Sequence, residues 1–125
     1  MISIMAVFSG NSLKAQSPDA TFDKIASAIS GGNAAGLAAF FQANIEITLP
    51  GAEGVYSANQ AQFVVSDYFT KYPVSSFKIN LKGNSSGTFY ATGSYASAKG
   101  NFDTNIFVKN NGGNFQISTI RFETE

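Results

Sequence analysis

The sequence predicts an α+β domain in which three N-terminal helices pack on a strongly bent, mostly antiparallel sheet that ends in a four-stranded meander. Apolar residues recur at helical spacing up to Pro73, and from Ser75 onward they alternate with polar residues. Turns rich in Gly and Asn divide this second part into four segments. The chain has 125 residues, of which 44% are hydrophobic, and this is enough for one core. We therefore expect a single domain over residues 17–125.

Residues 1–16 have the order of a secretory signal peptide, or else form a disordered leader. The apolar run Ile2–Phe8 is followed by polar residues and by Leu13-Lys14-Ala15. Cleavage after Ala15 would place Leu13 and Ala15 at the positions that a signal peptidase reads. The run is too short to span a membrane, and no Lys or Arg precedes Lys14. The prediction is export to the periplasm or the extracellular space; the alternative is an N-terminal strand.

Two helices are expected next. Ser17 can cap the first one, Pro18 suits its first turn, and Gly31-Gly32 ends it. The apolar stripe of this helix consists of Phe22, Ile25 and Ile29. Asn33 can cap a second, shorter helix. That helix would carry Leu37, Phe40 and Phe41.

A strand, a short second strand and a third helix follow. Residues 45–49 alternate with period two, which predicts a strand with one buried face, and Val55-Tyr56 predicts a short partner. Ser57 and Gln60 have the spacing of a capping box, and Pro73 ends the helix that they begin. The side chains that this helix should bury are Ala61, Val64, Val65, Tyr68, Phe69 and Tyr72.

The chain from Ser75 onward predicts the antiparallel meander. Phe77, Ile79 and Leu81 share one face of its first strand, with Lys78, Asn80 and Lys82 on the other. The next strands are expected over residues 88–97, 102–109 and 115–123. Gly93 lies in mid-strand, so it predicts a bulge or bend that curves the sheet. The side chains expected to be buried across the whole domain include Ile25, Phe40, Phe69, Phe77, Ile79 and Leu81.

Four segments carry a resemblance to a known fold: residues 25–33, 37–41, 56–61 and 117–122. Together with the order of elements they resemble the nuclear transport factor 2-like (NTF2-like) superfamily of the cystatin-like fold, in which a bent sheet wraps a long helix to form a cone. Within it, the chain is most similar to an uncharacterised bacterial family, domain of unknown function 4783, over about residues 20–123. The matching segments are expected to pack in the core and to cap helices, and none of them is a catalytic motif. The resemblance therefore implies the fold, and it implies a small exported protein, without implying an activity.

Composition removes several kinds of chemistry. The chain has neither cysteine nor histidine, so it has no disulfide, no thiolate nucleophile, no zinc–thiolate site and no Ser-His-Asp triad. Eight basic and eight acidic residues give a net charge of zero, which argues against a nucleic-acid partner. We expect neither a metal nor a cofactor.

The candidate acids and donors are few. Asp67, Asp103 and Glu46 each fall out of phase with the apolar residues beside them, so they should face solvent. Tyr90 and Tyr95 have opposite phase in one strand, although a bulge at Gly93 could bring them to the same side. The resemblance implies what a catalytic site would contain, because ketosteroid isomerase-like enzymes of the superfamily use an Asp base with a Tyr or Asp donor, or an Asp-His pair. The lack of histidine excludes the Asp-His pair in this chain.

Two functions are consistent with these residues. The first is a non-catalytic exported module that binds a small apolar or amphipathic ligand, or a protein partner, through the cone or the sheet. The alternative is a small cofactor-independent enzyme that uses an Asp/Tyr pair in the cone. No catalytic residue is predicted. The candidate pocket residues are Phe40, Phe69, Tyr95 and Arg121, with Arg121 able to hold an acidic group only if it points inward.

A homodimer through the outer face of the sheet is also predicted. Related cone-shaped folds pair in this way, and the face should be poor in charge. Its candidate contact residues are Asn80, Thr92, Asn105, Phe107 and Ser118.

Overall fold

The computed structural model describes residues 17–125, so the predicted leader, residues 1–16, lies outside the described part of the chain. Over the described residues the elements are, in order, α2 (Pro18–Ser30), α3 (Ala34–Ala38), β1 (Phe41–Leu49), β2 (Ala52–Ser57), α4 (Ala58–Lys71), β3 (Val74–Ser85), β4 (Thr88–Ser97), β5 (Gly100–Asn111) and β6 (Asn114–Thr124). None of these helices is long and apolar enough to cross a bilayer.

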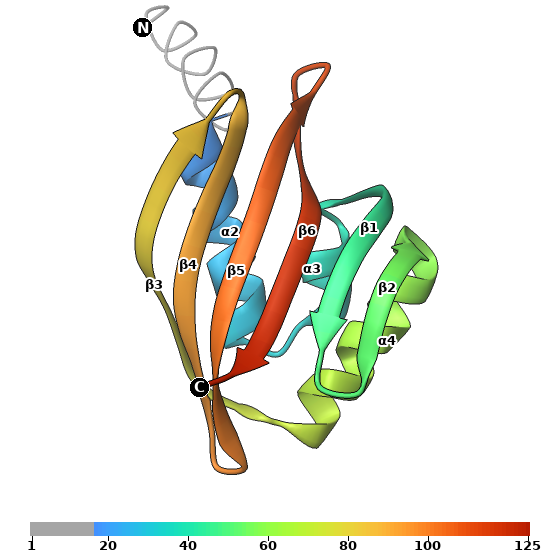
Figure 1. Ribbon diagram of the computed structural model, residues 1–125, viewed down its shortest axis with the longest axis vertical. Coiled ribbons are helices and arrows are strands. Elements are labelled where there is room, and N and C mark those ends of the chain that lie inside the picture. Colours follow the sequence, from blue (N-terminus) through green and yellow to red (C-terminus); the bar gives the residue numbers. More distant parts are fainter. Residues whose placement is uncertain (1–16) are drawn as a thin grey trace, which may run out of the picture.

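The strands form one curved, mixed sheet of six strands in the order β2-β1-β6-β5-β4-β3. The strands β3 to β6 pair antiparallel with their chain neighbours, whereas β1 and β6 run parallel. The helices lie against one face, and the opposite face is left uncovered by the described residues (Figure 1). The class is α+β and the elements follow the predicted order, with α4 after β1 and β2, so the description of all three helices as N-terminal to the sheet is inexact.

The predicted helix caps are present. Ser17 Oγ accepts from the Ala20 amide at 3.1 Å, and Asn33 Oδ1 accepts from the Gly36 amide at 2.9 Å. Ser57 Oγ accepts from the Gln60 amide at 3.3 Å, at the start of α4. Each side chain satisfies an amide that the first turn of its helix leaves without a partner.

The second helix is shorter than predicted, because α3 ends at Ala38 and Phe41 already belongs to β1. Phe41 pairs with Ile117 of β6, and the Ile117 amide donates to the Phe40 carbonyl at 2.6 Å. This long-range pairing extends the strand back beyond the alternation that begins at Ile45, which is the only part that local pattern reveals.

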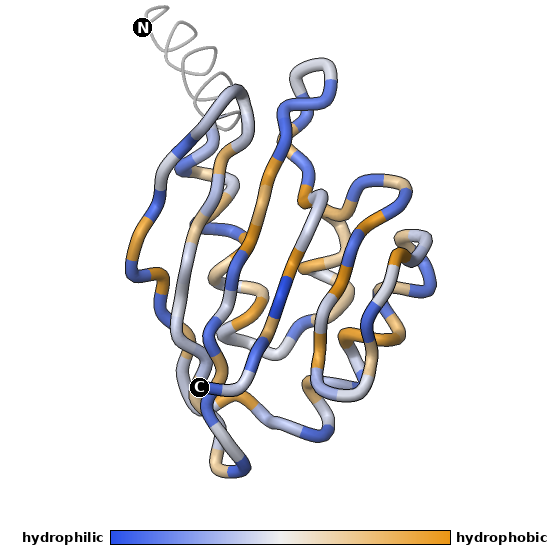
Figure 2. The backbone as a smooth tube through the Cα atoms, viewed as in Figure 1, coloured by the Kyte–Doolittle hydropathy of each residue, from blue (hydrophilic) through white to orange (hydrophobic). Residues whose placement is uncertain are grey.

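The core lies between the helices and the inner face of the sheet, and hydrophobic and hydrophilic residues alternate along the strands (Figure 2). Ile25 and Phe69 are buried as predicted, while Phe40, Phe77 and Ile79 are half-buried. The prediction for Leu81 is wrong, because its side chain is 58% exposed. Ile79 pairs with Gly93 and Leu81 with Thr92, so Asn80 is an extra residue that reverses the phase of β3.

The bulge that Gly93 was expected to make therefore lies in the neighbouring strand. β4 keeps an unbroken register with β5, so Tyr90 and Tyr95 stay on opposite faces. Gly93 pairs with Ile79 beside the bulge, and β3 approaches it closely. A Cβ at Gly93 would lie 2.7 Å from the Lys78 carbonyl oxygen and 2.9 Å from the Phe77 ring. A second bulge, at Ser118 of β6, buries that serine, and its hydroxyl donates to the Phe107 carbonyl at 3.3 Å.

Candidate functional site

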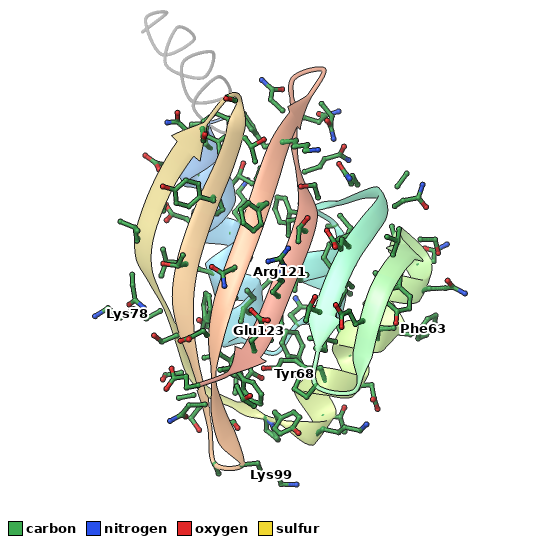
Figure 3. The ribbon with its side chains drawn as sticks, viewed as in Figure 1. Phe63, Tyr68, Lys78, Lys99, Arg121 and Glu123 are labelled. Carbon is green, nitrogen blue, oxygen red and sulfur yellow. The ribbon has the colours of Figure 1, made fainter. Side chains whose placement is uncertain are left out.

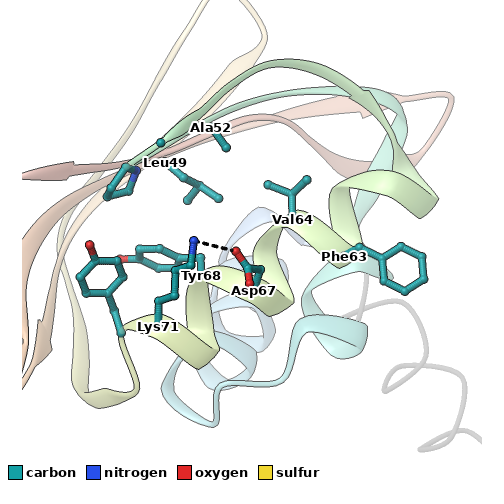
Figure 4. A pocket seen from close by; sticks show the side chains of 10 residues that line it. Leu49, Ala52, Phe63, Val64, Asp67, Tyr68 and Lys71 are labelled. Carbon is teal, nitrogen blue, oxygen red and sulfur yellow. Dashed lines mark ion pairs between the residues drawn. The ribbon is translucent and has the colours of Figure 1, made fainter.

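A groove of about 300 Å³ lies between α4 and the turn that joins β1 to β2. Leu49, Pro50 and Ala52 line it on the strand side, and Val64 lines it on the helix side (Figure 4). These side chains form an apolar wall. The local sequence places them there because Pro50-Gly51 reverses the chain, with Gly51 at φ 83°, and brings β2 back along β1 beside α4.

Tyr68 also lines this groove and is 3% exposed. Its ring packs near five others, and the three shortest centroid separations are 4.7 Å to Phe122, 5.3 Å to Tyr95 and 5.4 Å to Tyr72. Its hydroxyl is buried and has no hydrogen-bond partner in the described structure. Burial, with smaller contributions from Tyr95 and Tyr72, raises the pKa of Tyr68 far above its usual value.

Tyr95 reaches the same aromatic cluster from β4. Its ring is parallel to that of Phe69, with centroids 6.3 Å apart, and its hydroxyl donates to the backbone carbonyl of Tyr72. Burial raises the pKa of Tyr95 to about 12. Both Tyr68 and Tyr95 are therefore protonated near neutral pH, so each carries a hydroxyl proton to donate, and that of Tyr95 is already used.

One ion pair lies at the rim of the groove. Lys71 Nζ is 3.2 Å from the Asp67 carboxylate one helical turn earlier, and both side chains are about two-thirds exposed, at 64% and 65%. An exposed pair of this kind contributes about 0–1 kcal/mol, so it holds the two side chains only weakly. In the view of Figure 4 the pair lies next to Tyr68.

The structure brings together only two of the four predicted pocket residues. Phe69 and Tyr95 stack within the core. Phe40 is half-buried and lines a separate hollow of about 240 Å³ beside Phe115. Arg121 lies on the outer face of the sheet, where its guanidinium carbon is 5.9 Å from the centre of the Phe107 ring (Figure 3).

The sequence model of the family DUF4783, a domain of unknown function, matches residues 22–123. The chain belongs to the DUF4783 family. No curated protein matches it.

Solved structures of DUF4783 proteins share the fold. A family member from Bacteroides ovatus is 24% identical with a TM-score of 0.77, over 82% of this chain and 93% of that one. One from Bacteroides uniformis is 20% identical with a TM-score of 0.78, over 82% and 95%. A protein with a cystatin-like fold from Nostoc punctiforme is 14% identical with a TM-score of 0.66, over 85% and 74%. At these identities the likeness shows the fold alone, and it agrees with the NTF2-like, cystatin-like architecture expected from the sequence.

The acidic residues of this DUF4783 chain all face solvent. All eight Asp and Glu side chains fall within residues 17–125, and every one of them is exposed. No group of three acidic side chains in this part of the chain could hold a metal ion. The groove therefore offers an apolar wall and a phenol, with no carboxylate inside it.

The sequence did not single out Tyr68 as a site residue. Helical spacing indicated that it is buried, and this is correct, but spacing cannot show which buried hydroxyl lacks a partner. That depends on which backbone carbonyl lies within reach, and Tyr95 takes the Tyr72 carbonyl.

Proposed function

We propose that this DUF4783 protein is a non-catalytic binding module that holds a small apolar or amphipathic ligand in the groove between α4 and the β1–β2 turn. The observation that carries the proposal is the apolar wall of the groove, formed by Leu49, Pro50, Ala52 and Val64. A ligand that covers apolar surface gains about 25 cal/mol for each Å² removed from water. This gain does not require a reactive group.

The chemistry of the groove favours binding over turnover. General acid–base catalysis needs a group that exchanges a proton near the working pH and lies within reach of the substrate. The chain has no histidine or cysteine, and its carboxylates are exposed. Burial raises the pKa values of the Tyr68 and Tyr95 phenols, which moves them further from neutral pH.

A substitution that fills the groove tests the proposal. Ala52→Leu adds three carbons where β2 borders the groove, whereas Ala43→Leu makes the same change at an exposed site on β1 that does not line it. Ligands that co-purify with the native protein would be identified by mass spectrometry and then titrated into each variant. We expect Ala52→Leu to lose binding and Ala43→Leu to keep it. Equal binding by the two variants would place the ligand elsewhere.

We also propose that the protein is exported, on the strength of the apolar run and the Leu13-Lys14-Ala15 sequence. N-terminal sequencing of the protein from its natural host tests this. A mature chain that begins close to residue 16 supports export, and an intact Met1 on a cytoplasmic protein contradicts it.

A further inference from the structure

We infer that the groove takes a neutral ligand with an acceptor oxygen, such as a carbonyl, that receives a hydrogen bond from the Tyr68 hydroxyl. The inference rests on the proposed function and names the ligand class of the same site. It follows from the one feature of the groove that the aromatic packing does not explain: Tyr68 lines the groove, and its hydroxyl is buried without a partner in the described structure.

A buried hydroxyl without a partner destabilises the folded state, because it gives up its hydrogen bonds to water and gains none. Phenylalanine would fill the same aromatic cluster without this penalty. Tyr95 shows the contrast within the same cluster, since its hydroxyl donates to the Tyr72 carbonyl. A ligand oxygen that accepts from Tyr68 would remove the penalty only in the bound state, so it would add directly to affinity.

The surroundings of Tyr68 select a neutral acceptor. Its hydroxyl keeps its proton near neutral pH, so it donates. An anion would lose its hydration beside the rings of Tyr72, Tyr95 and Phe122, and the one cation that lines the groove, Lys71, is paired with Asp67 at 3.2 Å. A cation would meet no carboxylate inside, because Asp67 is exposed at the rim. A neutral carbonyl or ether oxygen meets neither obstacle.

A ligand would reach the Tyr68 hydroxyl past Lys71 and Tyr72, whose side chains are only weakly fixed in place. Lys71 is exposed and Tyr72 is half-buried, and both line the groove with Tyr68 (Figure 4). The exposed Asp67–Lys71 pair gives little resistance to movement of the lysine. The ligand therefore reaches Tyr68 by displacing side chains at the end of α4, without opening the sheet.

The test uses three probes of nearly equal shape. Acetophenone carries the acceptor oxygen, α-methylstyrene replaces that oxygen by a methylene group, and benzoate carries a charge. Each would be titrated into the purified protein while amide NMR shifts are followed in α4 and the β1–β2 turn. We expect acetophenone to bind more tightly than the other two, and Tyr68→Phe to weaken acetophenone binding about 2- to 10-fold while leaving α-methylstyrene unchanged.

Thermal stability provides the second readout. Tyr68→Phe should raise Tm by a few degrees because it removes an unpaired hydroxyl, whereas the matched Tyr95→Phe should lower Tm because it leaves the Tyr72 carbonyl without its donor. Unchanged acetophenone affinity in Tyr68→Phe, a lower Tm in that variant, or tighter binding of benzoate than of acetophenone would each overturn the inference. If no probe shifts the amides of the groove in the wild type, the proposed function itself fails.

Discussion

At the scale of single residues, the close packing of β3 against β4 depends on the missing side chain of Gly93. A Cβ at this position would meet the Lys78 carbonyl at 2.7 Å and the Phe77 ring at 2.9 Å. Gly93→Ala should therefore destabilise the protein by about 1–3 kcal/mol, as overpacking typically does. Urea denaturation would measure this. Gly31→Ala serves as the control, because its Cβ would lie 3.5 Å from the nearest atom at φ −89°, and it should be neutral or stabilising. Equal stabilities would contradict the close approach.

The buried tyrosines predict a loss of stability in alkali. Folding raises the pKa of Tyr95 from 10.0 to about 12, so the unfolded chain releases this proton first as the pH rises. The contribution of the protonated phenol is complete below pH 10 and falls between pH 10 and 12, by about 1.4 kcal/mol per pH unit for each such group. Tyr68 acts in the same direction.

The measurement is the free energy of unfolding at several pH values above neutral, for the wild type and for Tyr95→Phe. We expect the variant to be less stable near neutral pH and to lose stability less steeply above pH 10. Parallel curves for the two proteins would show that Tyr95 titrates alike in the folded and unfolded chains.

At the scale of elements, the bulge at Asn80 decides which side chains of β3 belong to the core. Ile79 precedes the bulge and is half-buried on the inner face, whereas Leu81 follows it and is 58% exposed on the outer face. Ile79→Ala should cost about 1–3 kcal/mol, and Leu81→Ala should stay within about 0.5 kcal/mol of the wild type. Chemical denaturation of the two variants decides the register. Similar losses in the two variants would mean that β3 runs without a bulge, because Ile79 and Leu81 would then share one face.

The same bulge marks the limit of prediction from the sequence. Helix starts depend on local signals, so Ser17, Asn33 and Ser57 could be identified as caps, and the exposed carboxylates followed from their phase beside apolar residues. The outward turn of Leu81 and the early start of β1 at Phe41 depend on partners distant in the chain, namely Thr92 and Ile117. The groove lies between a turn and a helix that are brought together only by folding. Which buried phenol lacks a hydrogen-bond partner also depends on the folded structure, so the sequence could not show it.

At the scale of the whole molecule, the uncovered face of the sheet is where we propose that a second copy binds. Tyr90 and Phe107 pair across β4 and β5 on this face, and Val55 is 70% exposed at its edge. Asp103 and Lys109 stand toward opposite ends of the outer side of β5, so a two-fold axis that crosses the strands would oppose them between copies. Of the contact residues predicted from the sequence, Ser118 is buried and is unsuited to the role.

A substitution at the centre of this face tests the dimer. We expect the wild type to show a mass that rises with concentration in sedimentation experiments, and Phe107→Lys to stay monomeric, because the contact would bury an ammonium group without a carboxylate partner. Phe63→Lys is the control, since Phe63 is 74% exposed but lies on α4 (Figure 3). A wild type that stays monomeric at high concentration would contradict the dimer.

The position of β6 has a consequence for how the chain reaches its native state. β6 follows the other five described strands in the chain, lies between β1 and β5, and pairs in parallel with β1, which begins at Phe41. Until β6 arrives, β1 and β2 have no bond to the rest of the sheet, and the inner face that receives α4 is incomplete. Because synthesis runs from the N-terminus and such distant pairings form slowly, the sheet remains in two parts until β6 has been synthesised. A delay of this kind keeps the chain in a form that is compatible with the export proposed above, and it makes β6, a strand of eleven residues, the element that completes the sheet.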